Sequence, residues 1–447
     1  MKRRLLPMMM TLVLVCALPI WAAFVTSGDV TNPLVETAEG TTPARVTTES
    51  ALRTALENGV SGIVLGEDID INTALNVTST LTLDLNGCVL RMTGNTRVFY
   101  VYNNATLTIQ DSSAAKSGTI TGGNAEDGGD GGGVYVEAYA TLEMTGGCIT
   151  GCRAEDGGGV YIDHNATLKM TGGCITGCHA SYGGGGIRSS GNLYMSGTAK
   201  IEKCTSNGGS DDAIWNAEGV IYADGGTVDG MVNSQGTITR SNGTNANAAT
   251  VFNKTVYLRG SKYTTRCIEA GTYNGTVENT GLITGGTFYG TVTMRKGSWG
   301  WESTGSISGG TFYGSIVNEV GPGQVTGGTF AVRFDTGDGT KPEPKLVPWN
   351  GKVSRPTSDP EKSGHTFTGW YLDNAPYDFA TPVTAPLTLT ARWEKVPSSG
   401  GYYYYPTTDA KADDAKGSPK TADPGVALYA ALSLLSLTGL TCTAKKR

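Results

Sequence analysis

Residues 145–178 decide the fold, and they read TGGCITGCRAEDGGGVYIDHNATLKMTGGCITGC. The phrase TGGCITGC is written twice in this stretch, 26 residues apart. The flanking phrases repeat as well: GGGVYV at 131–136 returns as GGGVYI at 157–162, and ATLEM at 140–144 returns as ATLKM at 166–170. The middle of the chain is therefore built from a unit of about 26 residues.

Each unit holds short strands separated by turns. The segments VYI and TLKM alternate apolar and polar residues, which is the period of a strand. Glycine, asparagine and aspartate, which favour turns, lie between these segments, and residues 75–330 show no convincing helical period. Strands this short cannot bury an apolar face alone, so the units must stack on one another. We therefore predict a right-handed parallel β-helix whose successive coils lie about 4.8 Å apart.

Residues 45–330 as a whole resemble the pectin-lyase-like right-handed β-helix family. The start of the region fits this resemblance, because a capped amphipathic helix is predicted from Thr47 to Gly59 and the phrase DLNGCVL follows it. In that family a short helix covers the apolar N-terminal end of the column. Later phrases, such as GGTVDGMVN at 225–233 and GGTFYGSIVN at 309–318, predict shorter and less even coils of the same column. The predicted fold class is all-β, and this fold by itself indicates no particular function.

Five cysteines recur at the repeat spacing: Cys148 with Cys174, and Cys152 with Cys178 and Cys204. Equal spacing in a solenoid places equivalent side chains above one another, which predicts two cysteine ladders. The preferred interpretation is a structural ladder of buried free thiols, because cysteine is small and is frequently buried. Disulfides between neighbouring coils and a zinc site made of two C-x3-C pairs are the alternatives. Outside the two end segments the chain has seven cysteines, and an odd number argues against complete disulfide pairing.

Acidic residues gather at the turns of the central units. Glu126 and Asp127 are expected at the same turn as Glu155 and Asp156 of the next coil, with Asp130 nearby. Stacked carboxylates repel one another, and calcium would relieve that repulsion. We expect solvated charges at this turn, with calcium bound by Asp127, Asp130 and Asp156 as the alternative.

The sequence shows no convincing catalytic centre. The chain has three histidines, and His164 stands beside Asp163 at a turn where we expect both side chains at the surface. The paired-carboxylate motifs expected of a glycoside hydrolase on this fold are not visible. We therefore predict no catalytic residues, no bound metal and no cofactor.

Residues 332–395 differ in composition from the repeats and closely resemble one internalin B-type repeat, also called the Listeria–Bacteroides repeat. The matching phrases are VRFD at 332–335, GHTF at 364–367, GWY at 369–371 and ARW at 391–393. The resemblance implies a small β-grasp-like module that occurs in cell-envelope proteins and carries no known catalytic residues. Its core is most simply formed by its aromatic residues Phe334, Phe367, Trp370 and Trp393, with carbohydrate or protein binding by exposed aromatic residues as the alternative.

Both ends of the chain carry targeting signals. Residues 1–23 have a basic start, an apolar run and small residues at the end, which is the pattern of a secretory signal peptide, with a retained N-terminal anchor as the alternative. Residues 396–417 have the composition of a linker. Residues 418–447 combine the phrase SPKTAD, a charge-free span and a basic end, and this order resembles the LPxTG-type sorting signal of Gram-positive surface proteins. The resemblance implies that Pro419, Thr421 and Ala422 form the motif that a sortase cleaves, with the apolar span as a transmembrane segment. A plain C-terminal membrane anchor is the alternative, and in either case we expect the tail to hold the protein at the cell wall or membrane, facing outward.

Composition narrows the function further. The net charge of −6 argues against a nucleic-acid partner, which needs a basic face. We predict a non-enzymatic, monomeric adhesin or binding stalk of the cell envelope, whose ligand is a glycan or a protein on host or neighbouring cells. A tethered polysaccharide lyase or glycoside hydrolase of the β-helix class is the alternative.

Overall fold

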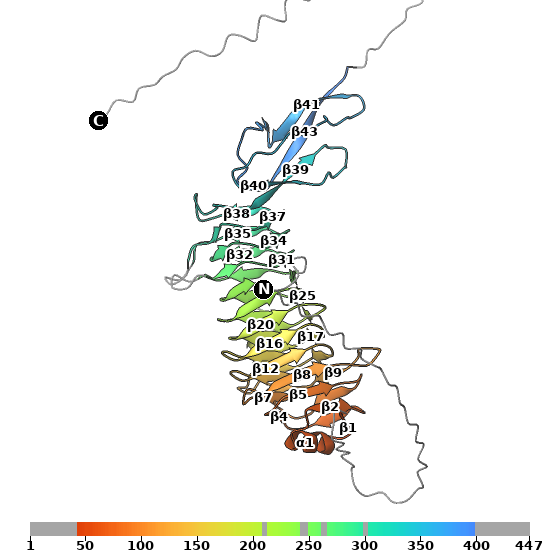
Figure 1. Ribbon diagram of the computed structural model, residues 1–447. Helices are drawn as coiled ribbons and strands as arrows, with labels where there is room; N and C mark the ends of the chain where they lie inside the picture. The colour runs from red at the N-terminus through yellow and green to blue at the C-terminus, as the bar shows by residue number, and fades with distance from the viewer. Residues whose placement is uncertain (1–42, 208–211, 242–248, 261–265, 298–302, 398–447) are drawn as a thin grey trace, which may run out of the picture. The chain divides into compact units, whose positions relative to one another are not determined.

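A computed structural model describes residues 43–207, 212–241, 249–260, 266–297 and 303–397. The predicted all-β fold is confirmed, because the described residues form long parallel sheets consistent with a right-handed β-helix and only one helix, α1 (Glu49–Glu57) (Figure 1).

Within the described residues the strands form three long sheets and one short sheet. Sheet A contains, in spatial order, β1 (Ala44–Val46), β2 (Gly62–Leu65), β5 (Leu81–Asp84), β8 (Thr106–Gln110), β12 (Thr141–Met144), β16 (Thr167–Met170), β20 (Asn192–Met195), β24 (Val220–Ala223), β27 (Thr237–Thr239), β30 (Cys267–Ile268), β33 (Leu282–Ile283) and β36 (Ser306–Ile307). Sheet C contains β4 (Leu75–Val77), β7 (Phe99–Val101), β11 (Val134–Val136), β15 (Val160–Ile162), β19 (Ile187–Ser189), β23 (Ile214–Asn216), β26 (Val232–Ser234), β29 (Val256–Leu258), β32 (Val277–Asn279), β35 (Val292–Met294) and β38 (Ile316–Asn318).

Sheet B is the sheet that runs on into the second part of the chain. Its coil strands are β3 (Ile69–Ile71), β6 (Val89–Met92), β9 (Thr119–Thr121), β13 (Cys148–Thr150), β17 (Cys174–Thr176), β21 (Lys200–Glu202), β25 (Thr227–Asp229), β28 (Val251–Phe252), β31 (Thr272–Tyr273), β34 (Thr287–Phe288) and β37 (Thr311–Phe312). It continues through β39 (Thr329–Asp335), β40 (Lys345–Pro348), β41 (His365–Leu372), β42 (Ala375–Pro376) and β43 (Leu387–Lys395). The short sheet D contains β10 (Asn124–Ala125), β14 (Arg153–Asp156), β18 (His179–Gly183) and β22 (Thr205–Ser206).

The sheets form different faces of the column. Sheet C lies on the side where Figure 1 labels β38, β35 and β32, and sheet B lies on the side of β37, β34 and β31. Equivalent strands of sheet A stack in register, so that Leu142 of β12 pairs with Leu168 of β16, which pairs with Leu193 of β20. All three leucines are fully buried, because alternate residues of each strand point into the column. The repeats of the sequence thus become ladders of like side chains.

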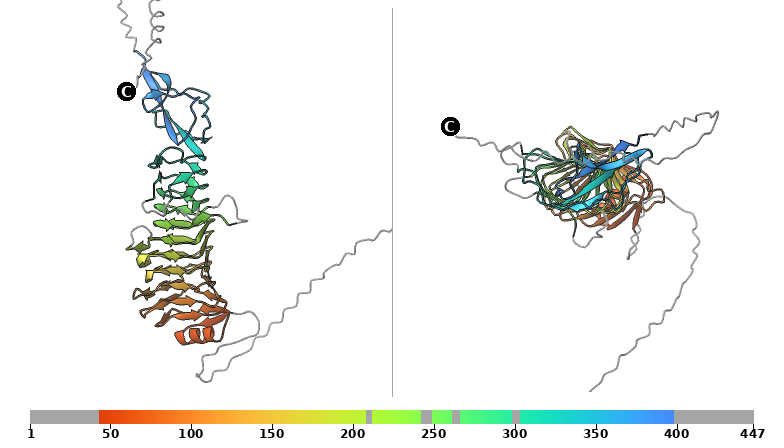
Figure 2. Two further views of the ribbon diagram at one scale, coloured as in Figure 1. Left: turned by 90° about the vertical axis from the view of Figure 1, so that its left-hand side faces the viewer. Right: turned by 90° about the horizontal axis from the view of Figure 1, so that it is seen from above.

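Helix α1 covers the N-terminal end of the column. The Thr48 hydroxyl accepts a hydrogen bond from the Ala51 amide at 3.2 Å, which satisfies one of the free amides of the first turn. Leu52 and Ala55 of the helix are buried among the side chains of the first coils. Figure 2 shows the helix below the first strands, where it shields their apolar interior from water.

Strand β39 belongs to the column and to the following module at once. Thr329 and Phe330 pair with β37 of the last coil, and the rest of the strand pairs in parallel with β43. The predicted boundary at residues 330–332 therefore falls inside a single strand, and the described residues up to Lys395 lie in one compact unit. A stack of buried rings runs through this junction: Phe252, Tyr273, Phe288, Phe312 and Phe330.

Several predicted segments lie outside the described residues. They are the signal peptide at 1–23, the linker from residue 398 onward, and the tail at 418–447 with Pro419, Thr421 and Ala422. In the part of the chain that the structure describes, no helix is long and apolar enough to cross a membrane.

Candidate functional site

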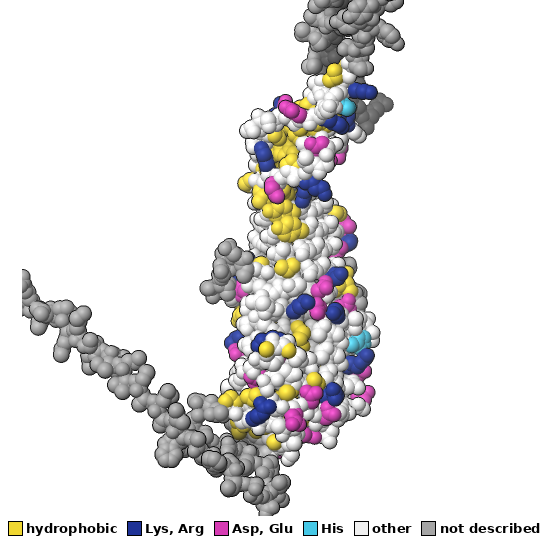
Figure 3. All heavy atoms as spheres, turned by 90° about the vertical axis from the view of Figure 1, so that its right-hand side faces the viewer, with side chains coloured by type: hydrophobic (Ala, Val, Ile, Leu, Met, Phe, Trp, Pro, Cys, Tyr) yellow, Lys and Arg dark blue, Asp and Glu magenta, His cyan; other side chains and the backbone are white. Residues whose placement is uncertain are grey.

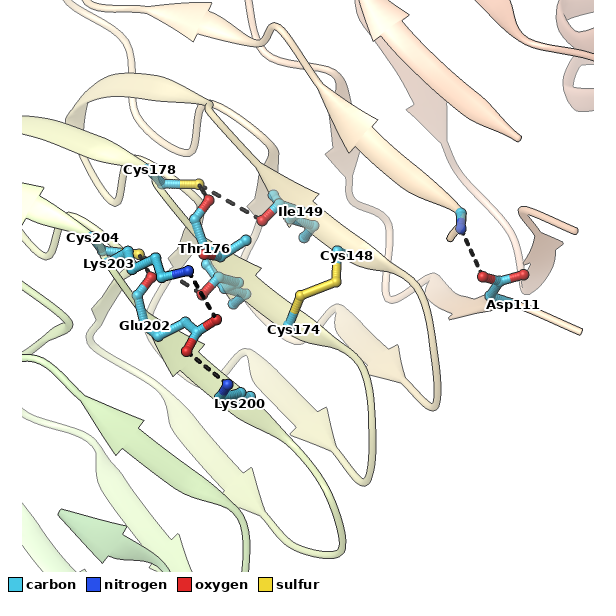
Figure 4. The surroundings of a disulfide bond; sticks show 12 residues. Asp111, Cys148, Ile149, Cys174, Thr176, Cys178, Lys200, Glu202, Lys203 and Cys204 are labelled. Carbon is cyan, nitrogen blue, oxygen red and sulfur yellow. Dashed lines mark hydrogen bonds and ion pairs between the residues drawn. A yellow bond between two sulfur atoms is a disulfide. The ribbon is translucent and has the colours of Figure 1, made fainter. Parts of the chain in front are cut away.

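The two cysteine ladders differ in their chemistry. Cys148 and Cys174 are paired in register on β13 and β17, and they form a disulfide between neighbouring coils (Figure 4). The preferred expectation of free thiols is therefore wrong at these two positions, because their side chains point away from the core and meet across adjacent strands. The next residue of that ladder is Lys200, so it ends after two cysteines.

The other ladder consists of free thiols inside the column. Cys152, Cys178 and Cys204 are all buried, and the thiol of Cys178 donates to the carbonyl oxygen of Ile149 at 3.9 Å. Hydrogen bonding with Cys152 and burial raise the pKa of the Cys178 thiol, which keeps it protonated and unreactive. No group of three or more His, Cys, Asp or Glu side chains within the described residues could hold a metal ion, so the zinc alternative has no support there.

Thiol counting tests this arrangement. Of the seven cysteines outside the two end segments, two form the disulfide and five are free: Cys88, Cys152, Cys178, Cys204 and Cys267. We expect five of these seven thiols to react with a thiol reagent in denaturant without reductant, and all seven after reduction. The double variant Cys148→Ser, Cys174→Ser should give five under both conditions. Seven thiols before reduction would show that the disulfide is absent.

The acidic turn is arranged differently from the prediction. Ala125 pairs with Ala154, but residues 126–129 then form an additional turn, which is closed by a hydrogen bond from the Gly129 amide to the Ala125 carbonyl at 2.9 Å. Asp130 rather than Asp127 therefore lies beside Asp156 of the next coil, since the amide after Asp130 donates to the Asp156 carbonyl.

These carboxylates do not form a calcium cage. Asp127 is exposed, whereas Asp130 and Asp156 are only partly exposed. Burial and the charge of Asp156 raise the pKa of Asp130, and burial raises the pKa of Asp156. Glu126 instead pairs with Arg153 at 3.3 Å, and among the described residues no three His, Cys, Asp or Glu side chains are placed here to hold a metal ion.

A row of aromatic and arginine side chains crosses sheet C beside these carboxylates. The residues at the middle of five neighbouring strands, β7, β11, β15, β19 and β23, are in register, and we call them the aromatic–arginine row: Tyr100, Tyr135, Tyr161, Arg188 and Trp215. The residues before and after each of them are buried in the core, so these five side chains point outward. At about 4.8 Å per coil the row spans about 19 Å.

The rings of the row lie against one another. The centroids of Tyr135 and Tyr161 are 5.0 Å apart with an interplanar angle of 6°, and those of Tyr100 and Tyr135 are 5.4 Å apart, edge to face. Burial raises the pKa of Tyr135 and of Tyr161, so both phenols stay neutral near pH 7. The row is thus a continuous, uncharged aromatic strip over three coils.

Two guanidinium groups extend the strip. The Cζ atom of Arg97 lies 5.6 Å from the centroid of the Tyr100 ring and 4.7 Å from that of Tyr135. The Cζ atom of Arg188 lies 3.9 Å from the Trp215 ring centroid and 5.9 Å from that of the neighbouring tyrosine. Both contacts are cation–π interactions, which hold the planar guanidinium groups beside the rings.

Polar groups border the row on both sides. Asp130 and Asp156 precede their strands, whereas Glu137 and Asp163 follow theirs. The Tyr100 hydroxyl donates to Glu137 at 2.9 Å, and the Tyr135 hydroxyl donates to Asp163 at 3.4 Å. Asp163 also accepts from its neighbour His164 at 3.0 Å, so this predicted pair lies at the edge of the row.

Three hydrogen-bond donors of the row are buried without a partner. They are Nε and Nη1 of Arg188 and Nε1 of Trp215. A buried donor without an acceptor costs about 1–3 kcal/mol relative to one that is satisfied. A ligand that brings acceptor oxygens to this end of the row would recover that free energy.

Stacked rings alone do not identify a binding site in this fold. Tyr194 and Tyr222 stack at 4.1 Å on sheet A, and Tyr289 and Tyr313 stack at 4.7 Å beyond sheet B. These are isolated pairs, and equivalent positions of a solenoid bring like residues together anyway. The row on sheet C differs because it combines rings, guanidinium groups and unpaired donors over five coils.

The opposite face carries a different surface. Figure 3 shows the side formed by sheet B, where acidic and basic side chains alternate along the lower part and hydrophobic side chains gather near the upper end. The paired charges there include Arg91 with Asp70 at 3.1 Å and Lys200 with Glu202 at 2.7 Å. Such exposed pairs are typical of a solvated surface.

Sequence reasoning missed the row although a signal was present. The phrases GGGVYV and GGGVYI place a tyrosine between two inward-facing residues in successive coils. Alternation then requires that tyrosine to face outward, at the same position of each coil. Arg188 and Trp215 occupy the equivalent position in the next two coils, but the phrases around them, IRS and IWN, no longer resemble VYV and VYI.

The module after the column has the core that its sequence predicts. Phe334 and Trp370 are buried, and their ring centroids lie 4.9 Å apart. Phe367 contacts Trp370 and Trp393 edge to face, and the indole of Trp393 donates to the Thr336 carbonyl at 3.0 Å. These aromatic residues therefore serve the interior of the module.

Comparison with known proteins identifies this module. Residues 330–392 match the family model of the Listeria-Bacteroides repeat domain. No curated protein and no solved structure matches the chain. The repeat is typical of surface proteins, and it indicates a protein of the cell surface or cell envelope.

Proposed function

We propose that the protein is a non-enzymatic adhesin that binds an extended glycan along the aromatic–arginine row. The single observation that carries the proposal is the row itself: outward-facing rings in register over neighbouring coils, with hydrogen-bonding groups on both sides. The faces of Tyr135 and Tyr161 lie against each other, so the apolar side of a sugar chain would contact the outward edges of the rings, whereas its hydroxyl groups need the donors and acceptors beside the row. A flat row about 19 Å long suits a chain of several sugars rather than a single one.

Export and anchoring are part of the same proposal. The signal-like segment 1–23 and the sorting-like segment 418–447 support a protein that leaves the cell and stays attached at its C-terminus. The sortase would cleave after Thr421, within the motif that includes Pro419 and Ala422. Release of the protein from cells by a muramidase, but not by detergent, would distinguish covalent attachment to the wall from a membrane anchor.

Substitution of Tyr135 tests the binding site. Tyr135→Ala is expected to weaken binding of a neutral oligosaccharide at least tenfold, because it removes the central ring of the row and one tenfold step corresponds to about 1.4 kcal/mol. Tyr135→Phe keeps the ring and should retain most of the affinity. The measurement is isothermal titration of the purified protein with hexasaccharides of several glycans.

Tyr194→Ala is the matched control, since it breaks a stacked tyrosine pair on sheet A and should leave binding unchanged. Equal losses in both variants would place the glycan elsewhere. If no glycan binds, but Tyr135→Ala abolishes adhesion to cells, the ligand is a protein and the glycan proposal is wrong.

One observation favours an enzyme as the second candidate. Asp130 and Asp156 lie on neighbouring coils beside the row, and burial raises the pKa of both carboxyl groups, as in a general acid. A tethered polysaccharide hydrolase or lyase would use such a pair. Turnover of a bound glycan that is lost in both Asp130→Asn and Asp156→Asn would establish the enzyme, whereas binding without turnover would support the adhesin.

A further inference from the structure

The row changes character between β15 and β23. Up to Tyr161 it consists of tyrosines, whose hydroxyl groups have acceptors in the first two coils. At β19 and β23 it consists of Arg188 and Trp215, and three of their donor atoms are buried without a partner. At this end of the row the folded protein therefore supplies no acceptor for these three donors.

The missing acceptors restrict what can bind there. Nε and Nη1 of Arg188 and Nε1 of Trp215 can only donate hydrogen bonds. A ligand group that carries a strong acceptor oxygen is favoured, and an analogue without it is rejected because the buried donors then stay unpaired. The guanidinium carbon of Arg188 lies 3.9 Å from the centroid of the Trp215 ring and covers one face of it, and the rest of this half-buried indole is the apolar surface beside the donors.

The nearby carboxylates restrict the charge of that group. Asp130 and Asp156 are both partly buried, and the guanidinium of Arg188 acts electrostatically on both. The two carboxylates also repel each other. Burial raises the pKa of Asp130, and the charge of Asp156 raises it further. The guanidinium groups of Arg97 and Arg188 balance the charges of these two carboxylates, so a third carboxylate, brought by a uronic acid, would add an unbalanced negative charge.

The same carboxylates can accept hydrogen bonds from the ligand. One oxygen of Asp156 accepts from the Gly183 amide at 3.1 Å, which leaves acceptor capacity on the group. The occupant should therefore combine a neutral acceptor, a donor and a small apolar part. An acetamido group has all three: a carbonyl oxygen, an N–H and a methyl group.

We propose that the Arg188–Trp215 end of the row is a subsite for the acetamido group of an N-acetylated hexosamine in an uncharged glycan. This inference rests on the proposed function, because it names the sugar class that the row selects. The carbonyl oxygen is bound by the unpaired donors of Arg188 and Trp215, the N–H faces the carboxylate side, and the methyl group contacts the part of the indole that the guanidinium leaves exposed. A free amino sugar is disfavoured, since its ammonium group accepts no hydrogen bond and would lie beside a guanidinium group.

The experiment compares three tetrasaccharides with the full-length protein by isothermal titration. They are the β-1,4-linked tetramers of N-acetylglucosamine and of glucose, and the tetramer of galacturonic acid. We expect the acetamido tetramer to bind about tenfold more tightly than the glucose tetramer, and the galacturonate tetramer to bind most weakly.

Trp215→Phe tests the contribution of the indole N–H donor separately from that of the aromatic ring. This variant removes Nε1 and keeps an aromatic surface, so the preference for the acetamido tetramer over the glucose tetramer should fall about threefold to tenfold while affinity for glucose stays the same. Tyr289→Ala, which lies beyond sheet B, is the control variant and should keep the full preference. Circular dichroism of each variant checks that the column is folded.

The outcomes separate the inference from the proposed function. Equal affinity for the acetamido and glucose tetramers, or an unchanged preference in Trp215→Phe, overturns the acetamido subsite but leaves a glycan-binding row. Preference for galacturonate overturns the charge argument, and with it the subsite. Absence of binding by every tetramer and by the longer oligosaccharides overturns both.

Discussion

Gly158→Ala is expected to destabilise the column by roughly 3 kcal/mol or more, because an added methyl group would meet the backbone of the next coil. A Cβ atom at Gly158 would lie 2.2 Å from the His179 carbonyl oxygen and 2.6 Å from that of Gly185. These are backbone atoms, and the His179 amide is itself tied to the preceding coil by a hydrogen bond to Cys152 at 2.9 Å. The coil cannot move away without breaking its own ladder.

The comparison variant is Gly62→Ala on sheet A. Its Cβ atom would lie 3.5 Å from Pro43, which is an ordinary van der Waals contact, and alanine is favoured over glycine within a strand by roughly 0.5–1 kcal/mol. Urea unfolding, followed by circular dichroism, should therefore show a large loss for Gly158→Ala and no loss for Gly62→Ala. A loss below about 1 kcal/mol in Gly158→Ala would mean that the spacing between coils adjusts to the methyl group.

The column could be predicted from the sequence because stacking repeats one environment in every coil. The leucine ladder of Leu142, Leu168 and Leu193 is written at nearly constant spacing, and each member is buried as alternation requires. The phrase GGG before β11, β15 and β19 has a physical reason of the same kind, since the next coil leaves no room for a side chain at its second and third glycines. Periodicity thus carries the fold even where residue identities change.

The predictions that were wrong concern the acidic turn and the first cysteine pair. They depend on register at a turn and on side-chain direction, which the repeat period does not determine. Asp127 and Asp156 look equivalent in the sequence because each follows a glutamate, but the additional turn at residues 126–129 brings Asp130 to that place. Likewise, equal spacing placed Cys148 above Cys174 and Cys152 above Cys178. Only the direction of the side chains makes the first pair a disulfide and the second a pair of buried thiols.

The candidate site could be predicted only in part. Alternation places Tyr100, Tyr135 and Tyr161 on the outside, so an aromatic strip follows from the repeats alone. The role of Arg188 does not follow, because its guanidinium could equally have paired with a carboxylate. In the structure the guanidinium lies on the Trp215 ring, and two of its donor atoms are unpaired. Only the three-dimensional arrangement shows this feature, on which the proposed ligand contact rests.

Phe312→Ala is expected to destabilise the last coils and the following module together, by roughly 3–5 kcal/mol. Phe312 is fully buried, and its ring lies between those of Phe288 at 4.7 Å and Phe330 at 5.7 Å. Phe330 belongs to β39, and one edge of this strand pairs first with β37 of the last coil and then with β43, while its other edge pairs with β40. The cavity left by the ring would therefore border both parts of the chain.

Hydrogen exchange followed by mass spectrometry distinguishes shared from separate stability. If the column and the module unfold as one unit, Phe312→Ala should speed exchange in peptides from β34 and from β43 to a similar extent, because exchange of core strands reports the same global opening. Phe312→Leu keeps most of the apolar volume and should cost less than about 1.5 kcal/mol, and Tyr313→Ala, an outward-facing neighbour, should change little. Faster exchange confined to β34 would mean that the module holds its fold independently, and that β39 joins two separate stability units rather than one.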